Sequence, residues 1–543
     1  MELSERLNRL SPSETLAMSQ KSNELKAQGV DVINLSVGEP DFNTPEHIKE
    51  AAKKAIDENY SRYSPVAGYP ALRNAIVAKL KNENGIDFSA AQISCANGAK
   101  QSVCNTIMAL VNAGDEVIIP ALLNRGLTLA DAREYNIIGC VEPQKAGKTD
   151  GWHDAAFFNM CRPLELVFSN GMDKGELVGI QTGDVTKMTT FEEFYDAYKK
   201  QMEYCISLLV NADNAIDVAH AERVPLPFES CMVDDCISRG LSVQEGGAIY
   251  NFTGPQGFGI ANMADSLYAI RKLVYEDKKV SMEEYKEALA WNYDKGLDEQ
   301  SVKDISEMIL KGMQDGGMNV TEDTAKAVLT TVMRLKPTEE QLRRFTEIHH
   351  MIDEVPKYGN AIDDVDYFAR DVAYTYTRPM QKYHNPRGGQ YQAGLYPVSA
   401  NVPLGGQTGA TPDGRYAHTP VADGVSPSAG KDVKGPTAAA TSVSRLDHFI
   451  VSNGTLFNQK FHPSALAGRE GLEKFVSLIQ TFFDQKGMHM QFNVVDRETL
   501  LDAQKHPEKY SHLVVRVAGY SALFTTLSRS LQDDIIRRTE QGF

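Results

Sequence analysis

Residues 514–524 (VVRVAGYSALF) place the strongest constraint on the fold, because a glycine lies at the centre of an apolar segment typical of a buried strand or loop. Glycine weakens such a segment, since it adds no side chain to the packing and loses the most conformational entropy on folding. It is expected there only where the bare backbone of Gly519 is itself needed. The fold therefore has to bring that backbone against a group that uses it.

Length and charge narrow the class of protein. The chain has 543 residues, of which 42% are hydrophobic and 24% are charged. That is too long for one ordinary core, so we expect two or more domains or one unusually large barrel. The net charge is −16 and no basic run occurs, so nucleic acids and anionic membranes are not expected as partners. Without a signal segment or an apolar run of about 18 residues, the sequence predicts a cytoplasmic protein.

The cysteines do not predict a metal site. Cys231 and Cys236 lie close together, but no second pair accompanies them, and the spacings match no zinc or ferredoxin pattern. We expect most of the seven to be buried thiols in a reducing compartment. The seven are at positions 95, 104, 140, 161, 205, 231 and 236.

The first segment, residues 1–121, has the pattern of an α/β fragment. Residues 46–58 (EHIKEAAKKAIDE) predict a helix, with Thr44 as its N-cap and Pro45 as its first residue. Further on, a polar turn precedes an apolar helix that ends at Gly114, and residues 116–120 (EVIIP) predict a strand. Backbone amides at the start of such a helix can hold a phosphate.

Three motifs in this segment resemble the N-terminal part of class I pyridoxal-phosphate aminotransferases. They are VGEPDF (37–42), YSPVAGYPALR (63–73) and GAKQ (98–101). The resemblance implies that Gly38 lies at the substrate carboxylate and that Tyr63 reaches a phosphate across a dimer. It also implies that Gly98 and Ala99 belong to a turn that cradles the cofactor phosphate.

The chemistry of such an aminotransferase does not follow. That chemistry needs a lysine for the Schiff base, an aspartate for the pyridinium nitrogen and an arginine for the substrate carboxylate. After residue 121 no segment provides them in a matching context. We therefore expect only a vestigial phosphate site and no functional pyridoxal phosphate.

The second segment, residues 122–543, carries a different resemblance. RVAGYSA (516–522) together with GCVEP (139–143) resembles the glycyl radical enzymes, the family of pyruvate formate-lyase and of the diol, glycerol and hydroxyproline dehydratases. The resemblance implies an unpaired electron on the α-carbon of Gly519, where no Cβ prevents its delocalisation into the flanking peptide groups. It also implies a separate radical S-adenosylmethionine activase that installs the radical, anaerobic conditions and a homodimer.

The resemblance assigns roles to two residues of one loop. Cys140 would relay the radical as a thiyl, because a thiol S–H bond and the glycine C–H bond are close in strength. Glu142 would act as the base that removes a proton from the substrate radical. Pyruvate formate-lyase carries two adjacent cysteines at this position and the present chain has one, which favours a dehydratase over acetyl transfer from pyruvate.

Two further residues are candidates for substrate binding. Within KTDGWHDAAFFN (148–159), the resemblance implies that Asp154 bonds substrate hydroxyls, although the same residue could instead cap a following apolar helix. Within the Gly/Pro-rich stretch 394–415, it implies that Tyr396 lines the substrate pocket.

The fold class expected is α/β, an incomplete ten-stranded glycyl radical barrel behind an aminotransferase-like fragment. We expect the fragment at 1–121, the barrel part at 122–429 and the glycine radical domain at 430–543. Only residues 122–139 precede Cys140, where such enzymes spend about half their chain, so unpaired strand edges are expected. Residues 115–121 (DEVIIPA) fit both families and are the expected joint.

Residues 295–350 are expected to be a helical insertion on the surface or at a dimer contact. Val302, Ile305 and Ile309 recur at helical spacing, and Thr338 with Gln341 predicts a capping box.

Together these features predict a glycyl radical dehydratase acting on a small hydroxylated substrate such as a diol, glycerol or hydroxyproline. Three alternatives remain open: a formate C-acetyltransferase-type glycyl radical enzyme, a pyridoxal-phosphate aminotransferase present only as a fragment, and a non-catalytic hybrid.

Overall fold

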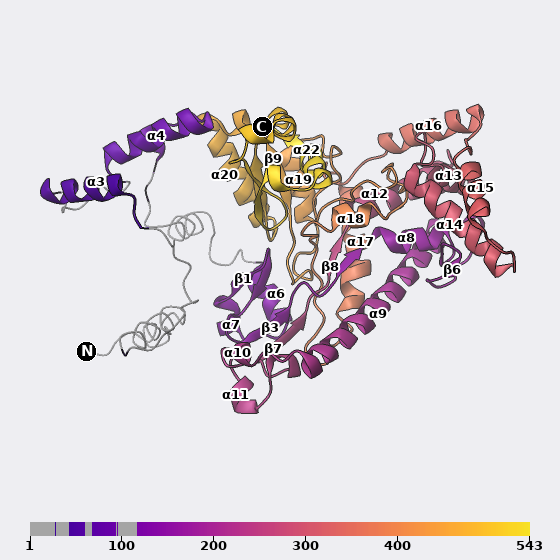
Figure 1. Cartoon of the computed structure of the whole chain (residues 1–543), viewed down its shortest axis with the longest axis horizontal. Helices are drawn as coiled ribbons and strands as arrows, with labels where there is room; N and C mark the ends of the chain where they lie inside the picture. Colours follow the sequence, from indigo (N-terminus) through magenta and orange to yellow (C-terminus); the bar gives the residue numbers. More distant parts are fainter. Residues whose placement is uncertain (1–27, 29–42, 60–67, 94, 96–116) are drawn as a thin grey trace. The chain divides into compact units, whose positions relative to one another are not determined.

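The computed structural model describes residues 28, 43–59, 68–93, 95 and 117–543 (Figure 1). The chain forms two compact units, one made of Met1–Asn84 and Phe88–Ala96, the other of Gly85–Asp87 and Asn97–Phe543. Gly38, expected at the substrate carboxylate, and Tyr63, Gly98 and Ala99, expected at the cofactor phosphate, lie outside the described residues.

The first unit contains the helix predicted from residues 46–58. Its described elements are α3 (Glu46–Asp57), α4 (Pro70–Asn84) and the 3-10 turn η1 (Ala90–Gln92). The predicted cap is wrong by one residue: Pro45 is the N-cap, with φ −54° and ψ 143°, and no side chain caps the helix. The extended ψ of Pro45 keeps it outside the helix, and its carbonyl accepts bonds from Ile48 and Lys49 at 3.0 and 3.2 Å.

The strand predicted from residues 116–120 is also wrong. Residues Ile118–Asn124 form helix α6 in the second unit, and Ala121 and Leu122 are fully buried. Leu122 packs with Leu127 and Phe252 in a small apolar cluster. A short apolar run does not distinguish a buried strand from a buried helix, so tertiary packing decides here.

Parallel strand pairs form the centre of the second unit. β3 (Thr149–Trp152) pairs with β7 (Tyr250–Thr253), and β4 (Phe157–Asn159) pairs with β8 (Gln256–Phe258). Single parallel bridges continue this pairing: Thr253 to Tyr391, Gln256 to Gly394 and Leu395 to Thr455.

Helices supply the long crossovers that parallel strands require. Those that follow the central strands are α8 (Cys161–Phe168), α9 (Phe191–Arg223), α12 (Ile260–Ile270) and α17 (Asp363–Met380). Every residue of α12 is buried, including the polar Asn262, Asp265 and Ser266, and α12 packs against α17. The combination of parallel strands and helical crossovers confirms the predicted α/β class.

The other elements up to residue 405 are short or peripheral. The helices are α7 (Leu129–Arg133), α10 (Pro227–Ser230), α11 (Cys236–Arg239), α13 (Met282–Ala290), α14 (Glu299–Asp315), α15 (Glu322–Val332), α16 (Glu339–Glu354) and α18 (Asn401–Gly405). The strands are β1 (Asn136–Ile138), β2 (Glu142–Gln144), β5 (Met172–Asp173) and β6 (Glu176–Leu177). The single turns are η2 (Val185–Lys187), η3 (Val243–Glu245) and the π-helical η4 (Arg271–Glu276).

The segment 295–350 is helical, as the sequence predicts. Helices α14, α15 and α16 fill it, and the capping box of Thr338 with Gln341 is present. The apolar stripe of α14 is only partly covered, since Ile309 remains 38% exposed. In Figure 1 these helices gather at one end of the second unit, away from β1 and β3.

The C-terminal part packs a three-stranded parallel sheet and a hairpin against helices. Its strands are β9 (Asn458–Phe461), β10 (Gln491–Val494), β11 (Val514–Arg516), β12 (Ser521–Leu523) and β13 (Glu540–Gln541). Its helices and turns are α19 (Pro436–Ser444), η5 (Pro463–Leu466), α20 (Gly468–Asp484), α21 (Arg497–Lys505), η6 (Pro507–Lys509), η7 (Phe524–Thr526) and α22 (Arg529–Arg537).

The segment around Gly519 is therefore two short strands and the turn between them. β11 and β12 pair antiparallel with Arg516 opposite Ser521, which places Gly519 in the turn. Val515, Val517 and Phe524 are buried and hold this hairpin in a separate apolar cluster. Within the described part of the chain, no helix is long and apolar enough to cross a membrane.

Candidate active site

The backbone of Gly519 lies directly against the side chain of Cys140. Gly519 has φ +84°, a conformation that favours glycine. A Cβ added at this position would overlap the Cβ and Sγ of Cys140 and lie 3.0 Å from its Cα. The conformation and the close approach both require the bare backbone that the sequence pattern indicates.

The loop that carries Cys140 folds around the carboxylate of Glu142. It joins the antiparallel strands β1 and β2, in which Ile138 pairs with Glu142. The backbone N–H of Cys140 donates to Glu142 Oε2 at 2.6 Å, and the N–H of Val141 donates to the same oxygen. Gly139 has φ +60°, and a Cβ there would lie 2.6 Å from Glu142 Oε1. The loop sequence Gly-Cys-Val-Glu therefore holds the thiol and the carboxylate in one fixed turn.

Tyr396 connects the two candidate carboxylates. Its hydroxyl contacts Glu142 Oε1 and lies 2.8 Å from Asp154 Oδ1. A phenol has one proton, so it donates to one carboxylate, and the second contact needs a proton on a carboxyl group. Burial raises the pKa of Glu142, and partial removal from water raises that of Asp154, although Asp154 itself is an exposed residue. The three side chains can therefore both take up and release a proton.

Asp154 does not cap a helix. The chain after it forms β4, and the next helix, α8, has Met160 as its N-cap. The N–H of Cys161 is satisfied instead by the side chain of Asn159 at 3.0 Å. The capping alternative for Asp154 is therefore wrong.

The thiol of Cys140 is held in its protonated form. Burial, together with the nearby carboxylates Glu142 and Asp154, raises its pKa to about 11. The side chain is half-buried, packed in a cluster with Val141 and Ala518. An intact S–H bond at neutral pH suits hydrogen-atom transfer, whereas a nucleophilic cysteine needs a lowered pKa.

Two buried residues near the loop that carries Cys140 were not predicted from the sequence. His153 contacts Asn453 Oδ1 at 2.6 Å and Gln144 Oε1 at 3.2 Å, and burial lowers its pKa to about 3, so it is neutral. Arg125 donates to the carbonyl of Pro143 at 3.1 Å, and burial lowers its pKa to about 9. The contact of His153 with Asn453 joins segments 300 residues apart, and no local sequence pattern indicates it.

The turn of Gly519 is held by side chains of β10. Gln491 and Asn493 are two positions apart and so share one face of the strand. Gln491 Oε1 accepts the N–H of Gly519 at 3.0 Å. Asn493 bonds both the N–H and the carbonyl of Arg516, each at 2.8 Å. Both residues lie in the stretch QFNVV, which the sequence analysis did not separate from its surroundings.

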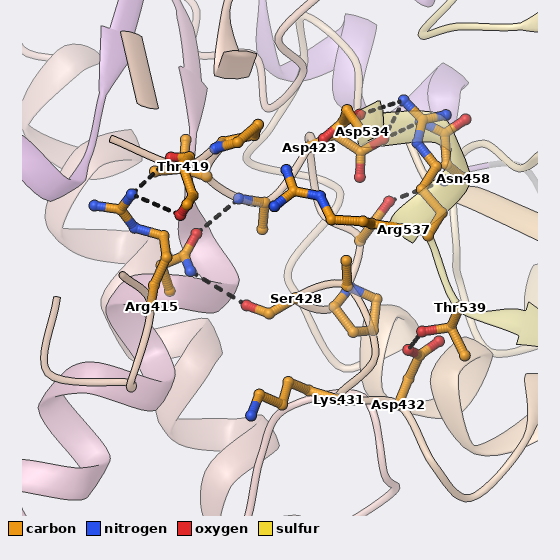
Figure 2. A pocket seen from close by; sticks show the side chains of 18 of the residues that line it. Arg415, Thr419, Asp423, Ser428, Lys431, Asp432, Asn458, Asp534, Arg537 and Thr539 are labelled. Atoms are coloured by element: carbon orange, nitrogen blue, oxygen red, sulfur yellow. Dashed lines mark hydrogen bonds and ion pairs between the residues drawn. The ribbon is translucent and has the colours of Figure 1, made fainter. Parts of the chain in front are cut away.

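A charged cavity of about 360 Å³ is lined by the loop at 413–432, by β9 and by residues between 534 and 541. Figure 2 shows Asp423, Asp534 and Asn458 together on one side of it and Arg415 with Thr419 on another. Neither Cys140 nor Gly519 lines this cavity. One of its residues, Arg538, donates to the carbonyl of Val517 at 2.8 Å, so its wall supports the turn that carries Gly519.

The described residues contain no cluster of three or more histidine, cysteine, aspartate or glutamate side chains that could hold a metal ion.

The chain belongs to the pyruvate formate lyase-like family, whose model matches residues 101–405, more than half of its length. A glycine radical domain matches residues 421–525, a range that contains Gly519 and supports a protein-based glycyl radical. Residues 30–123 match the aminotransferase class I and II family, which confirms the resemblance at the N-terminal end. The first and third matches overlap over 101–123, where the predicted joint lies.

Solved structures and curated proteins extend this family assignment. A structure described for 1,2-propanediol dehydration in Roseburia inulinivorans is 68% identical, with a TM-score of 0.77, over 79% of this chain and 51% of that one. The B12-independent glycerol dehydratase from Clostridium butyricum is 53% identical, with a TM-score of 0.69, over 79% of this chain and 48% of that one. A probable dehydratase of Escherichia coli, YbiW, is 38% identical over 78% of this chain and 48% of its own length. The chain thus spans about half the length of the curated relatives it matches.

Proposed function

We propose that the chain is a glycyl radical dehydratase that removes water from a small vicinal diol or polyol. The observation that carries the proposal is the contact of the bare Gly519 backbone with Cys140, beside the Glu142–Tyr396–Asp154 cluster. Residues 430–543 would form the radical domain, 122–429 the barrel part and 1–121 an aminotransferase-like fragment. The protein would act as a homodimer and depend on a radical S-adenosylmethionine activase.

Cys140 would start the reaction. Its thiyl radical takes a hydrogen atom from the substrate carbon that bears a hydroxyl, so that a C–H bond breaks and the S–H bond forms. The hydroxyl on the resulting radical is far more acidic than before, and Glu142, held by its own loop amides, removes that proton.

The neighbouring hydroxyl then leaves. It takes a proton from the carboxyl cluster, through Asp154 or Tyr396, and departs as water. The remaining carbonyl-stabilised radical takes a hydrogen atom back from the thiol, and the thiyl of Cys140 takes one from Gly519. The proton given and the proton taken balance, so the cluster returns to its starting state.

The close similarity to the 1,2-propanediol and glycerol structures favours these two compounds as first substrates. The single cysteine of the loop supports dehydration over formate C-acetyltransferase chemistry. Incubation with 1,2-propanediol would yield propanal, which a coupled NADH-dependent reduction detects.

The test is anaerobic electron paramagnetic resonance after incubation with an activase that works on an intact relative. A doublet in the wild type that is missing from Gly519→Ala, together with aldehyde formation that Cys140→Ala abolishes, is the expected result. Gly240→Ala is a matched control, because Gly240 also has positive φ (+64°) but nothing lies within 4 Å of the added Cβ. A folded wild type that gives no doublet under these conditions would overturn the proposal.

Two simpler measurements test for a non-catalytic hybrid and for an aminotransferase. A cooperative thermal transition and a discrete dimer on size exclusion would contradict a hybrid that fails to fold. Absorbance of an internal aldimine after addition of pyridoxal phosphate would support an aminotransferase, and we expect none.

A further inference from the structure

We propose that Gln491 and Arg516 are positioning residues that stabilise the unpaired electron on Gly519 by polarising its two flanking peptide groups in opposite directions. The inference rests on the proposed function and adds two residues to it. Neither touches the substrate or donates the hydrogen atom.

The geometry places one side chain on each side of the Gly519 α-carbon. The N–H of Gly519 donates to Gln491 Oε1 at 3.0 Å. The carbonyl of Gly519 accepts from the guanidinium of Arg516 at 3.1 Å. The two groups bonded directly to the α-carbon are therefore both engaged, one by an acceptor and the other by a cation.

These two hydrogen bonds favour the same electronic change. A radical on a glycine α-carbon is stabilised when the amide nitrogen donates electron density and the carbonyl withdraws it. An acceptor on the N–H makes the nitrogen a better donor, and a guanidinium on the carbonyl oxygen makes the carbonyl a better acceptor. Both bonds also hold the flanking peptide planes in place, so the planar radical needs little rearrangement of the turn.

The orientation of the Gln491 amide is fixed by its other contacts. Its Nε2 faces Asn458 Oδ1 and lies 3.4 Å from the carbonyl of Val517, and both of these partners are acceptors. The amide must therefore present its oxygen to the N–H of Gly519. Gln491 is only 5% exposed, and the strand that carries it, β10, pairs in parallel with β9.

Arg516 is held as firmly through its backbone. Asn493 bonds its N–H and its carbonyl, each at 2.8 Å, and the guanidinium has a second contact with Ser521 Oγ at 3.3 Å. The guanidinium thus reaches the Gly519 carbonyl from a backbone that is pinned on both sides. Such preorganised contacts do not have to form when the radical appears.

The exchange that these residues bias is a single hydrogen-atom transfer. The S–H bond of Cys140 forms as the α-C–H bond of Gly519 breaks, and the reverse step restores both. No further reactant takes part. Loss of either contact shifts the exchange toward the thiyl by about tenfold, the effect of one hydrogen bond of ordinary strength.

The experiment compares the radical signal of Gln491→Met, Arg516→Met, the double variant and the conservative variant Arg516→Lys. Less delocalisation leaves more spin on the α-carbon, so the Met variants should show a wider α-proton doublet and an about tenfold lower ratio of glycyl to thiyl radical. The double variant should show the widest doublet. Arg516→Lys should return toward the wild-type splitting.

Gln541→Met is the matched control for replacing a buried glutamine. Gln541 lies in β13 of the same sheet and donates to Asp432 at 2.6 Å, away from Gly519. Its doublet should equal that of the wild type. Thermal melts of all variants would show whether each is folded when its spectrum is recorded.

The remaining outcomes are also decisive. A doublet in the Met variants with unchanged splitting and yield would overturn the inference and leave the proposed function intact. Loss of the signal in folded Arg516→Lys as well would assign Arg516 to recognition by the activase and overturn the inference. A wild type without any doublet would overturn the proposed function and this inference together.

Discussion

The Sγ of Cys140 occupies the space into which a side chain at position 519 would project. A thiol from a loop between β1 and β2 thus meets the turn between β11 and β12, although the two are far apart in the sequence. The contact is possible only with glycine at 519, so the stability and the chemistry of the turn depend on the same missing side chain.

Gly519→Ala is expected to lower the free energy of unfolding by about 2–4 kcal/mol. Alanine at positive φ costs about 1–2 kcal/mol, and the overlap with Cys140 adds a cost typical of overpacking. Gly240→Ala should show only the conformational part, because nothing surrounds its Cβ. Urea denaturation of both variants measures the difference. An equal decrease in the free energy of unfolding of the two variants would show that the turn around residue 519 moves away from Cys140 without an energetic cost.

Glu142→Gln is expected to separate radical storage from dehydration. The amide keeps the size of the side chain but accepts no proton, so the doublet of Gly519 should form while aldehyde production falls at least about a hundredfold, within the usual range for loss of a general base. Glu134→Gln is a suitable control, since Glu134 is an exposed partner of Lys145 at 2.9 Å in the same region. Full activity of Glu142→Gln would remove Glu142 from the mechanism.

The same substitution should make the Cys140 thiol easier to ionise. The negative charge of Glu142 contributes to the raised pKa of about 11, after burial. Without it, the pKa falls and the thiolate fraction at pH 9 rises. The rate of Cys140 alkylation by iodoacetamide, followed by peptide mass spectrometry, should therefore increase at pH 9 in Glu142→Gln. An unchanged pH profile would mean that burial alone sets this pKa.

Several parts of this structure could be predicted from the sequence because they depend on residues that are close together in the chain. The loop Gly139–Glu142 has a tight turn, a thiol and a carboxylate within four residues, and the capping box of Thr338 is equally local. The strand expected at 116–120 failed because an apolar run of that length suits either a helix or a strand, and burial of Leu122 decides it.

Other residues of the site carry no such signal. His153 meets Asn453, and Gly519 meets Gln491, only after distant segments have folded together. Histidine and glutamine at these positions look like ordinary polar residues in the sequence. Their importance lies in the atoms they contact, and only the three-dimensional structure provides those.

A buried carboxyl group outside the site should give the stability of the second unit a defined pH dependence. Asp213 lies on α9, is 3% exposed, and has one carboxyl oxygen without a hydrogen-bond partner among the described residues. Burial, together with the charge of neighbouring Asp217, raises its pKa to about 7. Because the folded pKa lies above the unfolded value, the folded state binds more protons than the unfolded state between about pH 4 and pH 7.

The stability that protonated Asp213 contributes is therefore fully present below about pH 4 and is lost as the pH rises toward 7. Asp213→Asn keeps a neutral side chain, so its free energy of unfolding relative to the wild type should rise over this interval. Each unit of raised pKa corresponds to about 1.4 kcal/mol, so the free energy of unfolding of Asp213→Asn relative to the wild type should rise by a few kcal/mol at most. Asp196→Asn, an exposed carboxylate of the same helix, should show no such trend. A difference between Asp213→Asn and the wild type that stays constant from pH 4 to pH 8 would contradict the raised pKa.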